Sequence, residues 1–276
     1  MCGRPLSVRY DEEARILYVA DAYLGIFKVD MTNNVSKLLV GGGQVVNGRP
    51  LKFFNDLILW NDVILFTDTS SRWTRRDHMN IFLEAIPDGR LLVYDPRSDT
   101  LHALVDHLYF ANGIELAADR LSLFIVETVA ARIHRYYVGG SNHGKIELWA
   151  ENLPGFPDNI RVSSDGGHYW VGMAMSRRRG AWLNFFDFLA DKPWLRRLIA
   201  QVFSCKTLNW LNGWWPRHGL VVKLDAEGRI VDSLQDPGGE VIGGVSEVAD
   251  KGSQLYLGSY YAPFIAKLAV KQATSN

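Results

Sequence analysis

The sequence predicts an all-β protein of the β-propeller class, and three observations support this expectation. Short runs of aromatic and β-branched residues, each about as long as a strand, recur along the 276-residue chain. Turn pairs such as Asp88-Gly89 and Glu227-Gly228 separate the runs. The runs fall into units of about 40–50 residues with four strands each, which is typical of propeller blades.

Five such units follow one another, with expected bounds of 3–48, 50–107, 108–152, 155–236 and 240–271. The first four each carry an edge-like fourth strand, as at 36–40, whereas the fifth shows three strands. The chain begins with the first strand of its own blade, so its N-terminus cannot supply the strand that the fifth unit lacks. We therefore expect a single propeller domain over residues 1–276, with about five blades of a six-bladed ring and the N-terminal blade absent.

The fourth unit is interrupted by a segment near 181–205. Apolar residues at 194, 195, 198, 199, 202 and 203 follow helical spacing, and Pro193 suits the first turn of a helix. We expect a helical insertion that projects from the ring. Its apolar face could pack on the propeller, cover the channel mouth as a lid, or rest on a membrane surface through 181–203.

Composition and charge exclude some classes of partner. The chain is 47% hydrophobic and 22% charged, which is ordinary for a soluble globular protein. Its formal net charge is +0, so no overall field attracts nucleic acid, and we expect no nucleic-acid partner. Cys2 and Cys205 fit no metal-binding spacing and could be free or paired.

Sequence signals for membranes and secretion are sparse. No apolar run reaches the roughly 18 residues that span a bilayer, and no signal peptide opens the chain. The abrupt start in a strand suggests that upstream sequence is missing. Asn34-Val35-Ser36 is the one Asn-x-Ser/Thr sequon, so Asn34 would be glycosylated if the chain entered the secretory pathway.

Polar side chains recur at the starts of three first strands: Asn55-Asp56, Asn112 and Asp158-Asn159. Equivalent positions in a radial repeat lie around one axis, so their oxygen atoms would converge. Carboxamide and carboxylate oxygens suit Ca²⁺, which takes about 6–8 oxygen ligands. The sequence therefore predicts a calcium site, and the alternative is ordinary turn chemistry, because Asn and Asp also open many strands through local hydrogen bonds.

Two carboxylates are candidates for catalysis. Asp158 belongs to the predicted metal site, and Glu247 lies in the expected first strand of the last unit. Strand alternation places Ser246 and Glu247 on opposite faces, so Glu247 could face the channel as a base or face a neighbouring blade. His78 falls in a long expected loop, where a solvated side chain is the usual outcome. No nucleophile elbow, P-loop or His-Glu-x-x-His motif is present.

Several stretches resemble the strictosidine synthase-like family, over about residues 2–270. They lie at 54–57, 66–71, 89–92, 110–113, 154–160, 246–248 and 255–259. The resemblance implies a six-bladed propeller related to paraoxonases and regucalcin-type lactonases. It also implies that the animal-type N-terminal membrane anchor is missing here, and that full-length relatives reside in the secretory pathway or at the cell-surface membrane.

The resemblance also implies a site. In the relatives, residues matching Asn55, Asn112, Asp158 and Asn159 hold a channel calcium, and Asp56 matches a ligand of a second, structural calcium in paraoxonases. A further glutamate ligand comes from the first blade of the family, and this chain has no counterpart to it.

The activity implied by the resemblance is ester hydrolysis. The catalytic glutamate of the plant synthase falls at Ser246, one residue before Glu247, which argues against true strictosidine synthase activity. We expect a calcium-dependent, arylesterase- or lactonase-like hydrolase of small esters. The alternatives are a non-catalytic propeller that binds a lipid or protein partner, and a truncated chain with exposed strand edges.

Overall fold

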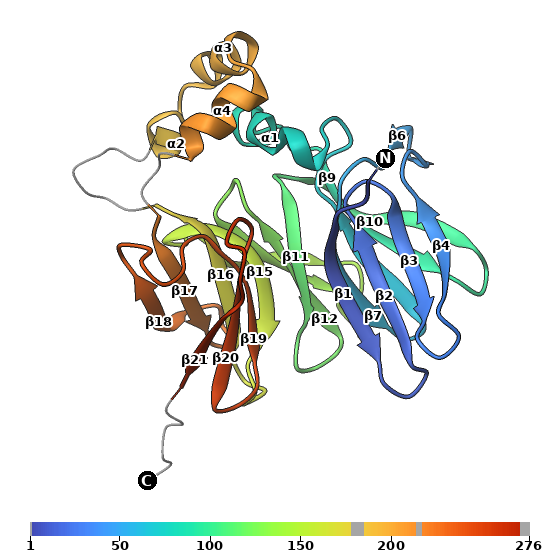
Figure 1. Cartoon of the computed structure of the whole chain (residues 1–276). Helices are drawn as coiled ribbons and strands as arrows, with labels where there is room; N and C mark the ends of the chain where they lie inside the picture. Colours follow the sequence, from blue (N-terminus) through green and yellow to red (C-terminus); the bar gives the residue numbers. More distant parts are fainter. Residues whose placement is uncertain (1, 178–184, 214–216, 271–276) are drawn as a thin grey trace. The chain divides into compact units, whose positions relative to one another are not determined.

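The computed structural model describes residues 2–177, 185–213 and 217–270. In this part of the chain, five antiparallel sheets follow one another, each with its strands in sequential spatial order (Figure 1). Four sheets have four strands and the last has three. The protein is therefore mainly β with a five-bladed propeller arrangement, and the predicted fold class is confirmed.

We number the sheets as blades from the N-terminus. The first blade has β1 (Pro5–Asp11), β2 (Ile16–Asp21), β3 (Gly25–Asp30) and β4 (Val35–Gly41); the second has β7 (Phe54–Trp60), β8 (Val63–Asp68), β9 (Gly89–Asp95) and β10 (Thr100–Leu108). The third has β11 (Ala111–Leu116), β12 (Ser122–Glu127), β13 (Arg132–Tyr137) and β14 (Ile146–Ala150); the fourth has β15 (Gly155–Val162), β16 (Tyr169–Ser176), β17 (Gly219–Leu224) and β18 (Ile230–Asp236). The fifth has β19 (Val245–Asp250), β20 (Gln254–Ser259) and β21 (Ala266–Ala269), and β5 (Val45–Val46) pairs with β6 (Arg49–Pro50) as a separate ribbon.

The chain divides into two compact units, which we describe separately. The first unit comprises residues 1–114 and 194–209, and the second comprises residues 115–193 and 210–276. In the first unit, the alternating apolar residues of the first two blades pack face to face. Phe54 and Phe66 stack at 5.6 Å between ring centroids, and both are buried with Ala20, Ile26 and Val40 of the first blade.

The first unit also contains a fully buried ion pair. Arg90 on β9 donates to Asp68 on β8 at 2.5 Å, and neither side chain is exposed. The guanidinium also donates to the Val46 and Pro50 carbonyl groups, at 3.0 and 2.9 Å, and so ties the β5–β6 ribbon to the second blade. Burial raises the pKa of the Asp68 carboxyl, and Arg90 opposes that rise.

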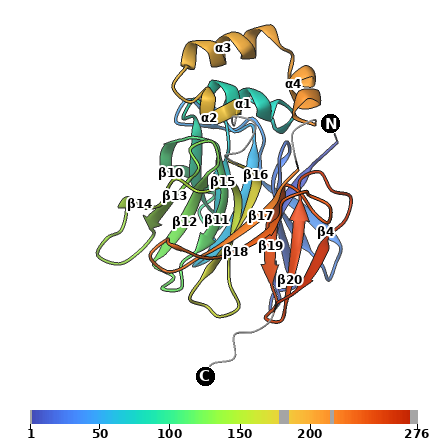
Figure 2. The same ribbon diagram turned by 90° about the vertical axis from the view of Figure 1, so that its left-hand side faces the viewer.

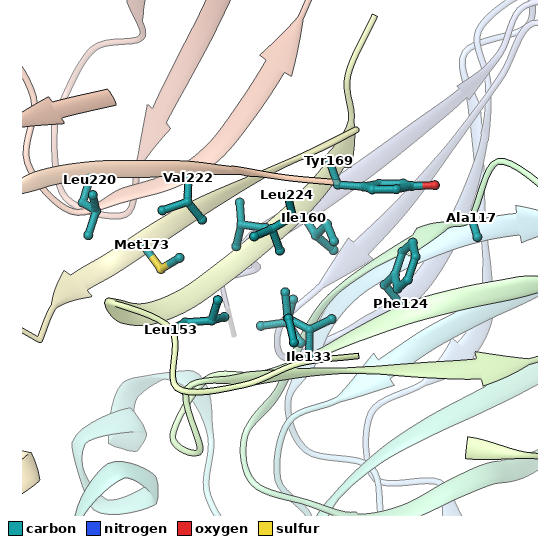
Figure 3. Packing of buried hydrophobic residues seen from close by; sticks show 13 residues of the cluster. Ala117, Phe124, Ile133, Leu153, Ile160, Tyr169, Met173, Leu220, Val222 and Leu224 are labelled. Atoms are coloured by element: carbon teal, nitrogen blue, oxygen red, sulfur yellow. The ribbon is translucent and has the colours of Figure 1, made fainter. Parts of the chain in front are cut away.

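In the second unit, the third and fourth blades share one apolar layer. Figure 3 shows side chains of both blades in this layer, including Ile133 and Phe124 of the third and Tyr169 of the fourth. Phe124 and Tyr169 meet edge to face at 4.7 Å, and the Tyr169 hydroxyl accepts a hydrogen bond from the Ala118 amide at 3.0 Å. The aromatic contact and the hydrogen bond of Tyr169 together hold the sheets of the third and fourth blades against each other.

Helices lie in the loops of the second and fourth blades. They are η1 (Arg75–Asp77), α1 (His78–Glu84), α2 (Phe185–Phe188), α3 (Pro193–Val202) and α4 (Cys205–Asn212). The predicted insertion helix beginning at Pro193 is confirmed as α3, whereas residues 181–184 of the predicted insertion lie outside the described residues. Both views show α3 beside α1 (Figures 1 and 2). No described helix is long and apolar enough to cross a membrane.

The expectation of a solvated loop around His78 is wrong, because this segment forms η1 and α1. Helix α1 is short and owes its stability to packing: it buries Met79, Ile81, Phe82 and Leu83. Burial, together with the neighbouring Arg75 charge, lowers the pKa of His78 to about 4, so its imidazole is neutral near pH 7. The two cysteines, left open by the sequence, are both free.

Candidate functional site

Of the four predicted metal ligands, Asn55 and Asn112 are the second residues of β7 and β11. Asp158 and Asn159, which were expected to open a strand, lie in the middle of β15, because that strand already begins at Gly155. Asn55 and Asn112 belong to the first unit and are buried, with 8% and 3% exposed. Asp158 and Asn159 belong to the second unit and are partly exposed. Each unit thus holds two of the four residues on first strands of blades, and the meeting of all four at one ion stays a prediction.

Hydrogen bonding determines which way the Asn55 carboxamide points. The Thr69 hydroxyl donates its single hydrogen to the Ala111 carbonyl at 2.7 Å. It can therefore only accept from Asn55, whose Nδ2 lies 2.9 Å from it. The assignment of amide nitrogen and oxygen follows from this network, and Oδ1 is the Asn55 atom left to accept a donor or a cation.

A second threonine, Thr67 on β8, connects the same two strands, β7 and β11. The Thr67 hydroxyl donates to the Asn112 carbonyl at 2.8 Å and accepts from the Asp56 amide at 3.1 Å. Thr67 and Thr69 are fully buried, so they hold the starts of β7 and β11 at a constant spacing. The residue facing them at the start of β9 has to be glycine, because a Cβ on Gly89 would lie 2.9 Å from the Thr69 carbonyl oxygen.

Sequence reasoning missed these two threonines. The signal was present as the Thr67-Asp68-Thr69 triplet, in which alternation places both hydroxyls on one face of the strand. Two hydroxyls on one strand face, beside two strands that carry an asparagine near their start, could have been identified as partners of those strands.

The Asn159 carboxamide in the second unit is oriented in a similar way. Its Nδ2 donates to the Ser246 carbonyl at 2.8 Å. A carbonyl oxygen can only accept, so the amide nitrogen has to face Ser246 and Oδ1 faces away from it. Two of the three predicted asparagine ligands thus have their donor group engaged by the protein, which leaves the oxygen for an electropositive partner.

Asp56 has a different environment from its neighbour Asn55. Its fully buried carboxylate accepts hydrogen bonds from the Ser7 hydroxyl at 2.5 Å and from the Leu57 and Ile114 amides at 2.9 Å each. The Arg9 guanidinium lies 3.6 Å away. These donors and the Arg9 charge already compensate the carboxylate within the protein, and the second, structural calcium that the family resemblance implied at Asp56 stays a prediction.

The carboxylate of Glu247 is engaged by an arginine. Arg161 on β15 donates to it at 2.7 Å, and the Glu247 side chain is 35% exposed. The pairing of β19 with β20 has an irregular register between Val245 and Glu247. A β-bulge here changes the simple alternation from which the facing of Ser246 and Glu247 was inferred. A catalytic role for Glu247 stays a prediction.

The chemistry of the candidate ligands is that of a hard-cation site. Within residues 2–177, 185–213 and 217–270, no group of three or more His, Cys, Asp or Glu side chains is placed to hold a metal ion. The predicted set is of another type, with three carboxamides and one carboxylate. Such oxygen donors suit Ca²⁺ better than Zn²⁺ or a redox metal, so the residues present fit calcium.

Known proteins similar in sequence cover nearly the whole chain. The strictosidine synthase family profile matches residues 55–141. Adipocyte plasma membrane-associated protein of Salmo salar is 45% identical over 97% of this chain and 63% of its own length, and that of Rattus norvegicus is 41% identical over 98% and 71%. Protein STRICTOSIDINE SYNTHASE-LIKE 10 of Arabidopsis thaliana is 37% identical over 96% and 69%. The chain thus spans about 63% of the Salmo salar relative.

Solved structures share the fold at low sequence identity. A gluconolactonase of Xanthomonas campestris matches 95% of this chain and 70% of its own, with a TM-score of 0.59 and 17% identity. Regucalcin of Agrobacterium tumefaciens, described as a calcium-binding protein, matches 94% and 70% with a TM-score of 0.57 and 13% identity. The gluconolactonase is a six-bladed propeller. The relatives that are similar in sequence show that the chain belongs to the strictosidine synthase family.

Proposed function

We propose that this protein is a calcium-dependent hydrolase of small esters or lactones, with arylesterase- or lactonase-like activity. The observation that carries the proposal is the orientation of Asn55 and Asn159, whose amide nitrogens are both engaged by protein acceptors. Gluconolactonase and the calcium-binding regucalcin share the fold, which adds support by analogy.

In this proposal, Asn55, Asn112, Asp158 and Asn159 hold the ion. Bound calcium would polarise the substrate carbonyl and stabilise the oxyanion that forms on attack by water. Asp158 or Glu247 would accept the proton of the attacking water. Thr67 and Thr69 would keep the ligand-bearing strands in place without touching substrate.

Strictosidine synthase chemistry is not the function we propose. That condensation relies on a glutamate that would fall at Ser246, and a serine side chain cannot supply a carboxylate. The backbone carbonyl of Ser246 instead orients Asn159.

We also propose a location in the secretory pathway or at the cell surface, as the name of the animal relatives suggests. Asn34 would then be glycosylated. It is exposed in the turn between β3 and β4 and has a φ of 56°, so the sequon lies where a transferase can reach it.

The direct test is hydrolysis of phenyl acetate and gluconolactone, with and without a calcium chelator, together with calorimetric titration of calcium. Chelation and Asn112→Ala should each lower turnover by about 100-fold or more. Because Asn112 is buried, Asp158→Ala serves as a second variant, and Asp165→Ala in the β15–β16 turn is the control for loss of one carboxylate. Turnover that survives chelation and both site variants would refute the proposal. Calcium binding without turnover would favour a binding propeller.

A further inference from the structure

Within the first unit, Arg196 connects helix α3 to α1. The Arg196 guanidinium donates to the Phe82 and Leu83 carbonyl groups at 2.6 and 2.9 Å. These carbonyls belong to the last turn of α1, where backbone oxygens lack partners within the helix and the dipole is negative. Arg196 thus caps α1, and burial lowers the pKa of its guanidinium.

Another face of α3 presents large apolar side chains to solvent. Trp194, Leu198 and Val202 are 67%, 48% and 65% exposed. They are spaced four residues apart, so they form one row along the helix. Phe203, 42% exposed, follows Val202 directly after the end of α3 and adds apolar surface there. We call Trp194, Leu198, Val202 and Phe203 the α3 apolar row.

The surroundings of this row are basic. Arg197 and Lys206 are exposed, and α3 and α4 contain no aspartate or glutamate. The acidic residue just before α3, Asp191, pairs with Lys192 at 2.6 Å. The two adjacent arginines therefore have different environments. Arg196 caps α1, whereas the side chain of Arg197 is exposed to solvent. An apolar row beside cations, with a tryptophan at one end, is the pattern of helices that lie in the interface of an anionic membrane.

We infer that α3 rests on an anionic lipid surface, with the α3 apolar row among the acyl chains and Arg197 and Lys206 at the headgroups. The helix has ten residues, about 15 Å at 1.5 Å per residue, so it lies on a bilayer and does not cross it. A second copy of this chain fits the face less well, because a twofold interface would place the same basic side chains opposite each other.

The test is co-sedimentation of the full 276-residue chain with phosphatidylcholine vesicles, with and without phosphatidylserine. Binding should require phosphatidylserine and weaken as salt is raised. Arg197→Gln should weaken partitioning about fivefold, since each basic side chain near the surface contributes about 1 kcal/mol. Leu198→Asp should reduce binding more, because it removes an apolar contact and adds an anion.

The matched control is Val231→Asp on β18, where the side chain is 52% exposed and thus similar to Leu198. This variant should bind vesicles as the parent does, and far-UV circular dichroism should show that all variants are folded. Equal vesicle binding by Leu198→Asp and Val231→Asp overturns the inference, as does absence of binding by the parent chain. A parent dimer that Leu198→Asp makes monomeric assigns the face to a second copy and likewise overturns it.

Discussion

Strand β7 in the first unit carries Asn55 followed by Asp56, and strand β15 in the second unit carries Asp158 followed by Asn159, each at an irregularity in the register of the strand pair. Both asparagines donate through Nδ2 to a protein acceptor and are oriented by it. The aspartates differ. Asp56 is fully buried and accepts three hydrogen bonds from β1, β7 and β11, whereas Asp158 is partly exposed.

The difference shows that the same two residue types occur in two environments. A buried carboxylate with several donors and a nearby arginine stabilises the arrangement of strands, because its charge is already compensated. The partly exposed carboxylate of Asp158, also on the first strand of a blade, lies where an ion from solvent can reach it, as our proposal requires. We therefore propose that burial, and not the motif itself, decides which of the two carboxylates binds an ion.

The largest expected effect comes from Asp56→Ala. This change leaves the Ile114 and Leu57 amides and the Arg9 charge without their acceptor, so we expect the free energy of unfolding to fall by about 3–5 kcal/mol. Urea denaturation without calcium measures the loss, and Asp158→Ala is the matched control. A loss for Asp56→Ala no greater than for the control would contradict the anchoring role of Asp56.

Thr69→Val should have the next largest effect. Valine keeps the shape of threonine but removes the hydroxyl, so the buried Ala111 carbonyl and the Asn55 amide lose their partner at a cost of about 1–3 kcal/mol. If Asn55 is a calcium ligand, affinity should also fall by about 10–100-fold, as for other residues that orient a ligand. Thr100→Val, on an exposed part of β10, is the control in both denaturation and calcium titration. Unchanged affinity would remove Asn55 from the ligand set.

Sequence reasoning predicted the repeated blades well because strand alternation and turn residues are local signals. The blade bounds, the three-stranded fifth blade and the helix starting at Pro193 all agree with the structure. It failed at α1, where a short helix is stable only through its packing. The pattern around His78 contains no long apolar period, so nothing local distinguished a helix from a loop.

The sequence named the candidate ligands, whose assembly into one site stays a prediction, and it did not indicate the residues that orient them. Asn55 and Asp56 were treated as one polar cluster, although their side chains have different partners. The Ser7 and Arg9 contacts of Asp56 come from about fifty residues away in sequence, and no pattern along one strand could indicate them. Roles that depend on distant partners require the folded structure.

Asp250 is the counterpart of Asp56 in the second unit, since its carboxylate ties β19 to the fourth blade. Burial acts to raise its pKa, but hydrogen bonds from the Ser164 amide, the Trp170 indole and the Ser163 hydroxyl outweigh it and hold the pKa at about 2. A carboxyl with a lowered pKa stabilises the fold above its unfolded value near pH 4, and this contribution disappears as pH falls towards 2.

Asp250→Asn should therefore lower the free energy of unfolding by about 1–2 kcal/mol at pH 7, a value reduced for solvent screening of this partly exposed group. The difference from the parent should shrink between pH 4 and pH 2, as urea denaturation at stepped pH would show. Asp232→Asn, on the exposed edge strand β18, is the control. A difference that stays constant with pH would mean that charge is not what Asp250 contributes.

The smallest effect on stability is expected for Asp158→Asn. The substitution keeps the shape of a partly exposed side chain, so the unfolding midpoint without calcium should change by less than the equivalent of about 1 kcal/mol. With calcium the two chains should diverge, because an ion that binds only the folded parent raises its stability in proportion to the logarithm of calcium concentration. Thermal melting at stepped calcium concentrations measures the stability of each chain. The Asp56→Asn variant should show the opposite pattern: its melting temperature should be lower than that of the parent in every condition, and calcium should still raise it. If both variants lost the calcium response equally, the separation of a structural carboxylate from an ion-binding one would be wrong.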